Sequence, residues 1–496
     1  MKRQLRDLKG KYISRSIESN IKYFSELFAD DAMYRIRKFN LPDDKNTLGC
    51  IIFFDGMVNS SIMNESVIRP LLISQYAEND DMTDYVEKHV LYANEVKKEK
   101  DIALILSDVL YGDSILMFDN CEYGLVIDTK GWRTRGISEP NDERVLQGPR
   151  EGFDEAVLPN IAMLRRKLGT PDLAIENLIA GRKTDTKIYL CYLKSVVDNN
   201  TVDKIKTRIN EIDIDGILDS NYINELINDR RFTLFKTMGS TERPDIVAAK
   251  LLEGRVAVFV DGTPVVLTAP YLFVENFQSD DDYYLNYLVA AIGRIMRYVC
   301  FYLSFCLPAF FAALTVFNPQ LVPVSFFTAV ASSRAGVPFS TFFEILLLTL
   351  VFEMLKETGI RMQESVGHAL SIVGGLVVGQ AAVEAKIISA PVLIITALSG
   401  IAGLMVPKLK GAVFYLKIIF LIFASTLGLF GFFVSFTLMH AQLFYIDSFG
   451  VQYTSVLSEK DVSNFKDGLI RVPWGRMIKR PTELTHNLIR QKRKSK

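Results

Sequence analysis

Hydrophobic and polar residues divide this chain into two unequal parts. Up to about residue 297 they are mixed, whereas from Val299 to Met439 long stretches carry almost no charge. A helix that crosses a bilayer needs about 20 consecutive apolar residues. Four segments approach that requirement: 299–317, 366–383, 388–406 and 412–438. The pattern therefore predicts an α-helical multi-pass transmembrane domain over residues 295–440, with about four crossings.

A further apolar segment, 341–355, contains two carboxylates, Glu344 and Glu353. A charge at the bilayer centre costs about 2.5–3.5 kcal/mol, so we expect this segment to be re-entrant, interfacial or buried among helices. The tail, residues 441–496, is rich in Lys and Arg, and positive segments stay on the cytoplasmic side. No apolar run follows the basic N-terminus, so we expect a cytoplasmic soluble region. Two cytoplasmic ends require an even number of crossings, whereas five crossings would place the tail outside.

The soluble part is predicted to be a helical segment followed by two similar α/β units. Residues 1–45 carry apolar side chains at helical spacing, which predicts an amphipathic helix within 1–40. Residues 46–145 and 181–290 each contain a short helix that starts at Asp-Ile and leads through a glycine into a hairpin. We interpret the two units as related cytoplasmic α/β subdomains from an internal duplication. Chance similarity between two common helix–hairpin units is the alternative.

A linker over residues 146–180 is expected between the two subdomains. It opens with a Gly-Pro pair, which is unsuited to regular structure. The run around this pair is a candidate hinge that consists of Gly148, Pro149, Arg150, Glu151 and Gly152. A helix is predicted from about 158 to 168. In the alternative interpretation, the acidic residues of the run form the solvated first turn of that helix and face its positive end.

Composition and charge argue against several classes of function. The 57 basic and 57 acidic side chains balance, so no nucleic-acid-binding surface is predicted. The five cysteines include no CxxC pair and the four histidines are scattered, which indicates neither a disulfide framework nor a metal site. The acidic run 280–282 is interpreted as a solvated charge run. No nucleophile, base or metal set is assembled, so we expect neither enzyme activity nor a cofactor.

The segment 366–383 combines small residues with a second, different face. Gly375 and Gly379 form a Gly-x-x-x-Gly pair that permits close helix packing. The other face carries, at helical spacing, Val373, Val377, Gln380 and Glu384. Around a central axis these four residues would line a pore with a hydrophobic constriction and a polar mouth, and such constrictions gate by dewetting. The alternative is tight packing within one subunit, without a pore.

Several longer motifs resemble the A subunit of GerA-type spore germinant receptors. In the soluble part they are the run 148–155 and the residues Glu242, Arg243, Pro244, Asp245, Gly254, Arg255, Asp261 and Gly262. The transmembrane part adds 337–339, 359–361, 371–374 and 379–385. The resemblance extends from about residue 45 to 475. Ala335 and Gln363 depart from the family pattern, and both lie in connections, where they affect loop shape rather than membership.

The resemblance implies a role in sensing small nutrients at the inner membrane of a dormant bacterial spore. Members of that family are understood to act with a transporter-like B subunit and a lipoprotein C subunit, and nutrient binding is expected in the B subunit. The A subunit is expected to form a homo-oligomeric ring in contact with membrane lipid. This ring would be a nutrient-gated channel for monovalent cations, which favours pore lining over simple packing for 366–383.

Two other functions stay open for a subunit of such a complex. A permease would carry its substrate in discrete cycles and would have inverted repeats around a polar midplane site, but we see no inverted repeat. A non-conducting scaffold would use its soluble subdomains to bind a ligand or a regulator. Conductance of purified complexes would separate a channel from a carrier, and ligand binding to residues 1–290 would test the scaffold.

Overall fold

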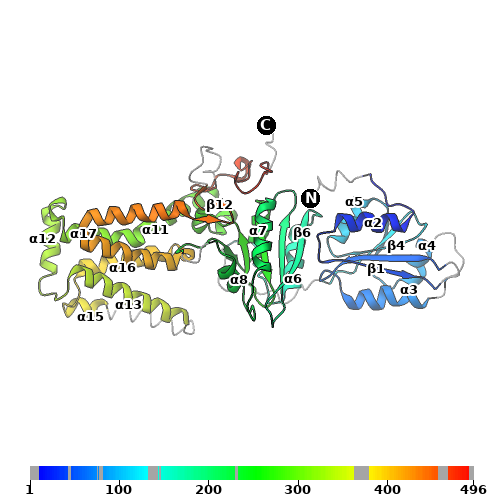
Figure 1. The fold of residues 1–496 in the computed structure, drawn as a ribbon, viewed down its shortest axis with the longest axis horizontal. Helices are drawn as coiled ribbons and strands as arrows, with labels where there is room; N and C mark the ends of the chain where they lie inside the picture. Colours follow the sequence, from blue (N-terminus) through cyan, green and yellow to red (C-terminus); the bar gives the residue numbers. More distant parts are fainter. Residues whose placement is uncertain are drawn as a thin grey trace.

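The computed structural model arranges the chain as three parts in a row (Figure 1). A first sheet with its helices forms one end, a second sheet lies in the middle, and a bundle of long helices forms the other end. The C-terminal segment returns from the bundle to the middle part. The structure describes residues 10–42, 46–74, 76, 82–131, 143, 147–229, 233–361, 379–455 and 467–490.

The two sheets share one strand order. The first has the order β1-β2-β4-β5-β3 and the second β6-β7-β9-β10-β8, and neighbouring strands pair antiparallel. Each strand of the first sheet thus has its counterpart five strands later, as an internal duplication predicts. The strands are β1 (Tyr34–Asn40), β2 (Leu48–Phe54), β3 (Val96–Glu99), β4 (Ser114–Phe118), β5 (Gly124–Ile127), β6 (Leu173–Ala180), β7 (Thr186–Leu193), β8 (Gly239–Thr241), β9 (Val256–Val260) and β10 (Val266–Ala269).

Helices cover both faces of each sheet, because alternate strand residues are apolar on either side. In β2, for example, Cys50 and Ile52 belong to one core and Ile51 to the other. One face of the first sheet packs on α2 (Ile17–Leu27) and α5 (Ile102–Val109), and the other on η1 (Ile62–Ile68), α3 (Arg69–Ile73) and η2 (Val86–Val90). The second sheet lies between α6 (Val157–Lys167) with α9 (Pro244–Leu252) and α7 (Asn199–Asn210) with α8 (Ser220–Ile227).

The two subdomains share one continuous hydrophobic core. Inside it, the buried guanidinium of Arg165 on α6 pairs with the buried carboxylate of Asp31, which precedes β1. The same guanidinium lies 4.3 Å from the centre of the Phe54 ring. The backbone N–H of Ala32 also donates to the carbonyl of Ile175 at 2.8 Å. The subdomains are therefore packed against one another and not only joined by a linker.

Two of the expected domain boundaries are wrong. Within the segment 1–45, expected to be helical, Tyr34–Asn40 forms β1 and pairs with β2 along its whole length. Within the linker expected over 146–180, Leu173–Ala180 forms β6 of the second sheet. Both strands are edge strands with polar residues on their solvent side. The mixed composition of β1 conceals it from an interpretation based on apolar runs. β6 is apolar at six of its eight positions, so its run is visible and its assignment to the linker is wrong.

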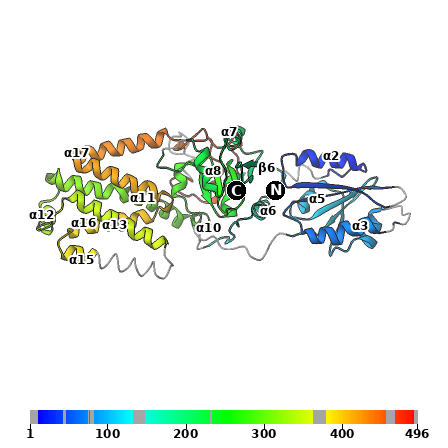
Figure 2. The same cartoon turned by 60° about the horizontal axis from the view of Figure 1, so that its bottom comes forward.

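The third part is a bundle that contains α11 (Tyr287–Val316), α12 (Val324–Ser333), α13 (Thr341–Arg361), α15 (Gly379–Glu384), α16 (Ala390–Leu404) and α17 (Lys410–Tyr445). α11 packs against α16 and α17, and α13 packs against α16 (Figure 2). Among the described residues, two segments are long and apolar enough to cross a membrane, Tyr287–Val316 and Pro407–Tyr445. They contain most of the predicted crossings 299–317 and 412–438, while 388–406 corresponds to the shorter α16. The single crossing expected over 412–438 is wrong, because the backbone of α17 leaves helical geometry at Gly428 (φ +63°, ψ −142°). Lys408 before α17 and Tyr453 after it both contact residues of η3 (Phe273–Phe277), so the two halves of α17 run antiparallel. Residues 366–378 of the other predicted crossing lie outside the described part of the chain.

α13 contains the segment 341–355 and continues to Arg361. Glu344 is fully buried, and its Oε2 accepts hydrogen bonds from the backbone N–H (2.8 Å) and the hydroxyl (2.6 Å) of Ser389. Its Oε1 lies 3.2 Å from Nη2 of Arg334. Of the three expectations for this segment, burial among helices is the one that this geometry matches.

The C-terminal segment is predicted to be a basic cytoplasmic tail, and its side of the membrane stays a prediction. Its residues 467–490 pack on the second subdomain. The Arg480 guanidinium donates to the carbonyl of Leu252 at 2.6 Å, and the Thr485 hydroxyl donates to the carbonyl of Val196. Just after α17, Phe449 enters the core of the second subdomain. The start of α11 and the end of α17 therefore lie at the same end of the bundle (Figure 1).

Candidate functional site

The motif residues predicted from the sequence converge on the start of α9, beside the linker. α9 begins at Pro244, whose fixed φ suits a first turn and whose missing N–H leaves no donor unsatisfied there. Asp245 lies in the same turn, where its carboxylate faces the positive end of the helix. The carbonyl of Glu242 accepts a hydrogen bond from the N–H of Phe153 at 2.8 Å. The motif therefore connects α9 with the linker.

Arg243 is the buried centre of this connection, with no exposed surface. Its Nη2 and Nε donate to the two carboxylate oxygens of Asp245 at 2.8 and 3.2 Å, a bidentate pair. Its remaining donors reach the carbonyls of Pro149 and Glu143, both at 3.1 Å. One guanidinium thus fixes the linker to the first turn of α9.

Gly148 is an exposed residue of the linker that lies directly against an aromatic ring. Its φ is +126°, and a Cβ at this position would lie 2.8 Å from Cδ2 of Tyr284. The hydroxyl of Tyr284 donates in turn to Asp245. The linker motif and the α9 motif, which are almost 100 residues apart in the sequence, therefore meet at one tyrosine.

Glu151 of the candidate hinge is also held in place, by ion pairs with α6. Glu151 pairs with Arg166 and Lys167 in the last turn of α6, at 2.8 Å for the lysine. Arg150 is exposed and Gly152 is buried. Glu151 does not lie in the first turn of α6, as the alternative interpretation required; it interacts with the opposite end of that helix.

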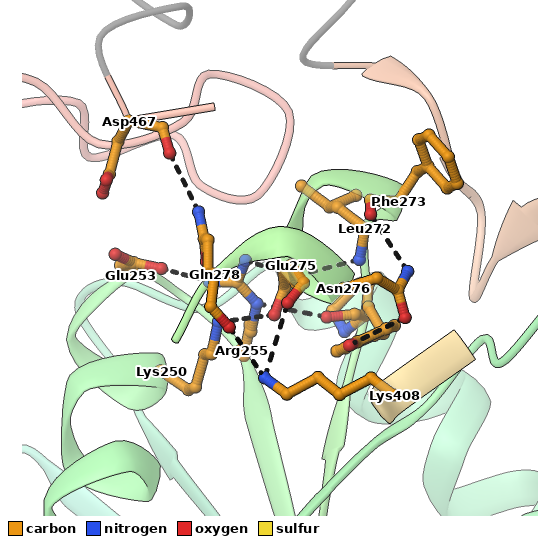
Figure 3. A network of polar contacts seen from close by, with 12 residues as sticks. Lys250, Glu253, Arg255, Leu272, Phe273, Glu275, Asn276, Gln278, Lys408 and Asp467 are labelled. Carbon is orange, nitrogen blue, oxygen red and sulfur yellow. Dashed lines mark hydrogen bonds and ion pairs between the residues drawn. The ribbon is translucent and has the colours of Figure 1, made fainter. Parts of the chain in front are cut away.

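A second cluster surrounds Arg255, at the start of β9, and Glu275 of η3 (Phe273–Phe277) (Figure 3). Their side chains are 3% and 2% exposed and lie 2.7 Å apart, from Nη2 to Oε1. Lys250 of α9 pairs with the other oxygen of Glu275, and Arg255 also pairs with Glu253. The N–H of Leu272 donates to Glu275 at 2.9 Å. Every strong donor near Glu275 thus stabilises its ionised form.

These contacts determine how the buried carboxyl group titrates. Burial alone would raise the pKa of Glu275, but Arg255, Lys250 and the Leu272 N–H lower it to about 2. The pKa of the neighbouring Glu253 is also lowered, by Arg255, Lys250 and Arg490, against the effect of burial. Both carboxylates are therefore charged at neutral pH and act as structural ions.

The same cluster receives contacts from the bundle and from residues 467–490, which we call the returning segment. Lys408, just before α17, donates to the carbonyl of Gln278 at 3.1 Å and approaches that of Glu275 at 3.5 Å. Arg490 lies 3.4 Å from Glu253. The Gln278 side chain donates to the carbonyl of Asp467 at 2.9 Å. Three parts of the chain therefore meet at this junction, which Figure 3 shows from close by.

The remaining motif residues shape turns around the same junction. Asp261 accepts a hydrogen bond from the N–H of Val157 at the start of α6 (3.2 Å), and Gly262 donates to the carbonyl of Glu155 at 2.9 Å. Gly254 has a φ of +101°, and a Cβ there would lie 2.7 Å from the carbonyl oxygen of Leu484. The motif glycines and Asp261 thus position α6 and the returning segment.

Of the pore residues predicted from the sequence, Gln380 and Glu384 lie on α15, at the far end of the bundle from this junction (Figure 1). Gln380 and Glu384 are exposed and hydrogen-bonded to each other at 2.9 Å, one helical turn apart. Gly379 is buried, and a Cβ there would lie 3.7 Å from Leu393. Val373, Val377 and Gly375 fall outside the described residues. Their pore-lining and packing roles stay predictions.

The sequence interpretation missed the charged residues that hold the junction together. The run 280–282 was interpreted as solvated, but Asp282 is buried and pairs with Arg294 (3.1 Å) and Arg297 (2.6 Å) of α11. The signal for this was present, since two arginines stand three residues apart just before an apolar segment. Within the described ranges, no group of three or more His, Cys, Asp or Glu side chains is arranged to hold a metal ion.

A family model described as the Bacillus/Clostridium GerA spore germination protein matches residues 22–483. The chain belongs to this GerA family. The match contains both sheets, the helical bundle and the first part of the returning segment, so family membership concerns the whole architecture.

Relatives of this GerA protein include several curated germination proteins. Spore germination protein KA of Bacillus subtilis (strain 168) is 37% identical over 475 residues, which is 95% of this chain and 87% of that protein. The uncharacterized membrane protein YfkQ of the same strain is 34% identical over 97% of this chain and 93% of that protein. The crystal structure of the N-terminal domain of the A subunit of the Bacillus megaterium spore germinant receptor GerK3 is 30% identical, covers 53% of this chain and 97% of that chain, and has a TM-score of 0.39.

Proposed function

We propose that this chain is the A-type subunit of a nutrient germinant receptor in the inner membrane of a bacterial spore. The observation that carries the proposal is the 37% identity to spore germination protein KA, which extends over 95% of this chain. Identity over that length includes the soluble subdomains and the helical bundle together. A role for the complete subunit is therefore supported, and not only a shared domain.

Germination of spores that rely on this receptor alone tests the proposal. In the native host without its other GerA-family genes, spores that keep this chain should respond to at least one nutrient in a panel of amino acids, sugars and nucleosides. Deletion of this chain should abolish that response. The fall in optical density of the spore suspension measures it, and a nutrient-independent trigger serves as the control for intact spores. Equal responses with and without the chain, over the whole panel, would contradict the proposal.

The bundle supports a membrane-embedded, multi-pass subunit with an even number of crossings. The start of α11 and the end of α17 both contact the second subdomain, because the Arg297 guanidinium donates to the carbonyl of Phe277 and Phe449 enters the core of that subdomain. The chain therefore enters and leaves the bilayer on one side, for which the basic C-terminus favours the cytoplasm. α13, with 21 residues, is about 31 Å long and reaches the thickness of the hydrocarbon core. Because α17 reverses at Gly428, α13 and the second half of α17 would together add two crossings to the four expected, and the number stays even.

We propose further that copies of this subunit assemble into a ring with the transporter-like B subunit and the lipoprotein C subunit. In that ring, 366–384 would line a path for monovalent cations, and the remaining helices would face lipid. The exposed Gln380 and Glu384 support this arrangement, because they present polar groups on one side of α15 without a contact that buries them. A nutrient would open the path by binding the open state more tightly than the closed state.

Shortening the predicted gate valines tests the channel. Val373→Ala and Val377→Ala should widen and wet the constriction, so spores should leak monovalent cations or germinate at lower nutrient concentration. Cation release before and after nutrient addition measures the effect. The matched control is Val324→Ala on α12, an exposed valine outside the predicted pore. Two gate variants that assemble normally and respond like the parent chain would show that these valines are not the gate.

A further inference from the structure

A cavity of about 270 Å³ lies at the junction of the second subdomain, the bundle and the returning segment. An engineered apolar cavity of about 150 Å³ holds benzene, so this space admits a somewhat larger molecule. The cavity is smaller than the range of about 300–1,000 Å³ typical of drug-sized ligands. Its charged and aromatic wall includes Glu143, Asp245, Lys250, Asp280, Tyr284 and Lys408.

Most of the charged groups in this wall already have partners. Asp245 is bound by Arg243, and Lys250 by Glu275. Arg490 lies 3.4 Å from Glu253. The carboxyl group of Glu143 accepts hydrogen bonds from the Thr241 hydroxyl and the Glu242 N–H, and burial raises its pKa. These groups form a closed network with little capacity to bind a ligand charge.

Lys236 also lines the cavity, but it is exposed to solvent. Asp280 and Lys408 are different. In the described part of the chain, the half-buried carboxylate of Asp280 has no hydrogen bond and no ion pair. The ammonium group of Lys408 reaches two backbone carbonyl oxygens, and no carboxylate among the described residues forms an ion pair with it. Burial raises the pKa of Asp280, and Lys408 is the charge that opposes this shift most strongly. An acid and a base therefore line one small cavity without contacting each other.

Opposite charges held apart in a confined space favour a ligand that neutralises both. A ligand with one charge would leave the other group without a partner, which is costly where hydration is incomplete. The other walls are largely apolar and aromatic, with Ile246, Tyr271 and Trp474. Such walls would accommodate a short apolar side chain. We propose that this cavity binds a small zwitterion of the amino-acid type, with its carboxylate at Lys408 and its ammonium group at Asp280.

A ligand in this position would connect elements that belong to different parts of the molecule. Lys408 precedes α17 of the bundle, and Asp280 is the N-cap residue of α10 (Asp281–Tyr284), the short helix before α11. Tyr284 contacts both Gly148 of the linker and Asp245 of α9. Binding would therefore favour the arrangement in which the second subdomain, the linker and the bundle are in contact. This inference goes beyond the receptor function proposed above and does not depend on ion conduction.

Binding of free amino acids to the purified full-length chain in detergent tests the site. The probes are the common L-amino acids, measured by isothermal titration calorimetry. For any amino acid that binds, its amide removes the carboxylate charge and its N-acetyl form removes the ammonium charge. We expect saturable binding of at least one amino acid, and at least about tenfold weaker binding of both derivatives, because each loses a charge-assisted hydrogen bond.

Matched variants assign the binding to this cavity. Asp280→Asn and Lys408→Met should each weaken binding at least about tenfold. Asp281→Asn and Lys410→Met change neighbouring charges that do not line the cavity and should leave binding unchanged. The derivatives are measured on the parent chain, so the test holds even if a variant fails to fold. No saturable binding by any amino acid, derivatives that bind as well as the parent amino acid, or binding unaffected by both cavity variants would each overturn the proposal.

Discussion

Glu275 shows how one buried carboxylate can hold several elements together. It accepts charge-assisted hydrogen bonds from Arg255 of the second sheet and Lys250 of α9, and a backbone hydrogen bond from Leu272. Removal of one member of a buried ion pair leaves the other without a partner and costs about 3–5 kcal/mol. Because the cluster lies at the junction of three parts of the chain, its ionisation affects how the whole molecule is assembled.

The pKa of Glu275 makes the junction sensitive to acid. Its folded pKa, about 2, lies below the ordinary value of 4.5, so the carboxylate stabilises the fold fully above about pH 4.5. This contribution, about 3 kcal/mol, is lost as pH falls from about 4.5 towards 2. Denaturant unfolding of the full chain in detergent between pH 7 and 3 should show this loss.

Glu275→Gln should remove that pH dependence along with the stability it represents. The difference in unfolding free energy between parent and variant should therefore shrink as the pH falls below 4.5. Glu225→Gln, a change at an exposed carboxylate of α8, is the control for the substitution itself. A difference between parent and Glu275→Gln that stays constant down to pH 3 would contradict the assigned role.

At the scale of elements, α13 and α16 are joined by a buried carboxylate at a helix start. Ser389 is the N-cap residue of α16, and Glu344 of α13 binds both its N–H and its hydroxyl. A carboxylate at this position faces the positive end of α16 and satisfies a donor that the helix leaves unpaired. Arg334, at the end of α12, lies 3.2 Å from the same carboxylate. Three helices thus meet at Glu344.

Removing this carboxylate should destabilise the bundle strongly. Glu344→Ala leaves Arg334 without its partner and Ser389 without its acceptor, which should lower the free energy of unfolding by about 3–5 kcal/mol. Glu353→Ala on the same helix is the matched control. It breaks a partly exposed i,i+3 pair with Lys356 (3.0 Å) and should cost less than about 1 kcal/mol. Equal effects of the two substitutions, in unfolding experiments on the full chain in detergent, would contradict this account.

The elements that could be predicted from the sequence are those with a clear apolar period. The central strands β2, β4, β7 and β9 are buried on both faces, so each forms a continuous apolar run that the sequence shows directly. The edge strand β1 carries charges on its open side, and nothing local distinguishes it from a polar segment. The edge strand β6 is apolar at six of its eight positions, so its local pattern did indicate a strand that our interpretation overlooked. The pairing of both edge strands is fixed by the neighbouring strand.

At the scale of the whole molecule, the returning segment brings the C-terminal part of the chain from the bundle back to the second subdomain. It contacts the second subdomain at Gly254, where the glycine has no side chain to hold the segment away. Gly262 provides a comparison, because its φ of +94° is similar but nothing lies within 4 Å of its Cβ position. An alanine has the same unfavourable backbone conformation at either site, about 1 kcal/mol.

Gly254→Ala should therefore loosen the returning segment, whereas Gly262→Ala should not. Hydrogen–deuterium exchange of the full chain in detergent should show faster exchange in residues 480–490 for Gly254→Ala. Gly262→Ala should leave exchange in this segment as in the parent, since only the first substitution places a methyl group against the Leu484 carbonyl. The same exchange in both variants would mean that the segment is held elsewhere.

The charged contacts of the junction could not be predicted from the sequence, for a physical reason. Arg294 and Asp467 are 173 residues apart, and Arg490 and Glu253 are 237 residues apart. No local period links such residues, and each taken alone looks like a surface charge. The α9 motif and the linker run were found because they resemble a family, although their contact with each other became visible only in the fold.

The continuous core between the two sheets has a mechanical consequence. Two bodies joined by a slack tether can shift independently, but Arg165 and Asp31 lie inside an apolar interior that would fill with water if the sheets slid apart. A displacement of the first sheet should therefore move the second sheet with it, because the two share one core. A partner that binds the first subdomain would then act on the bundle through both subdomains.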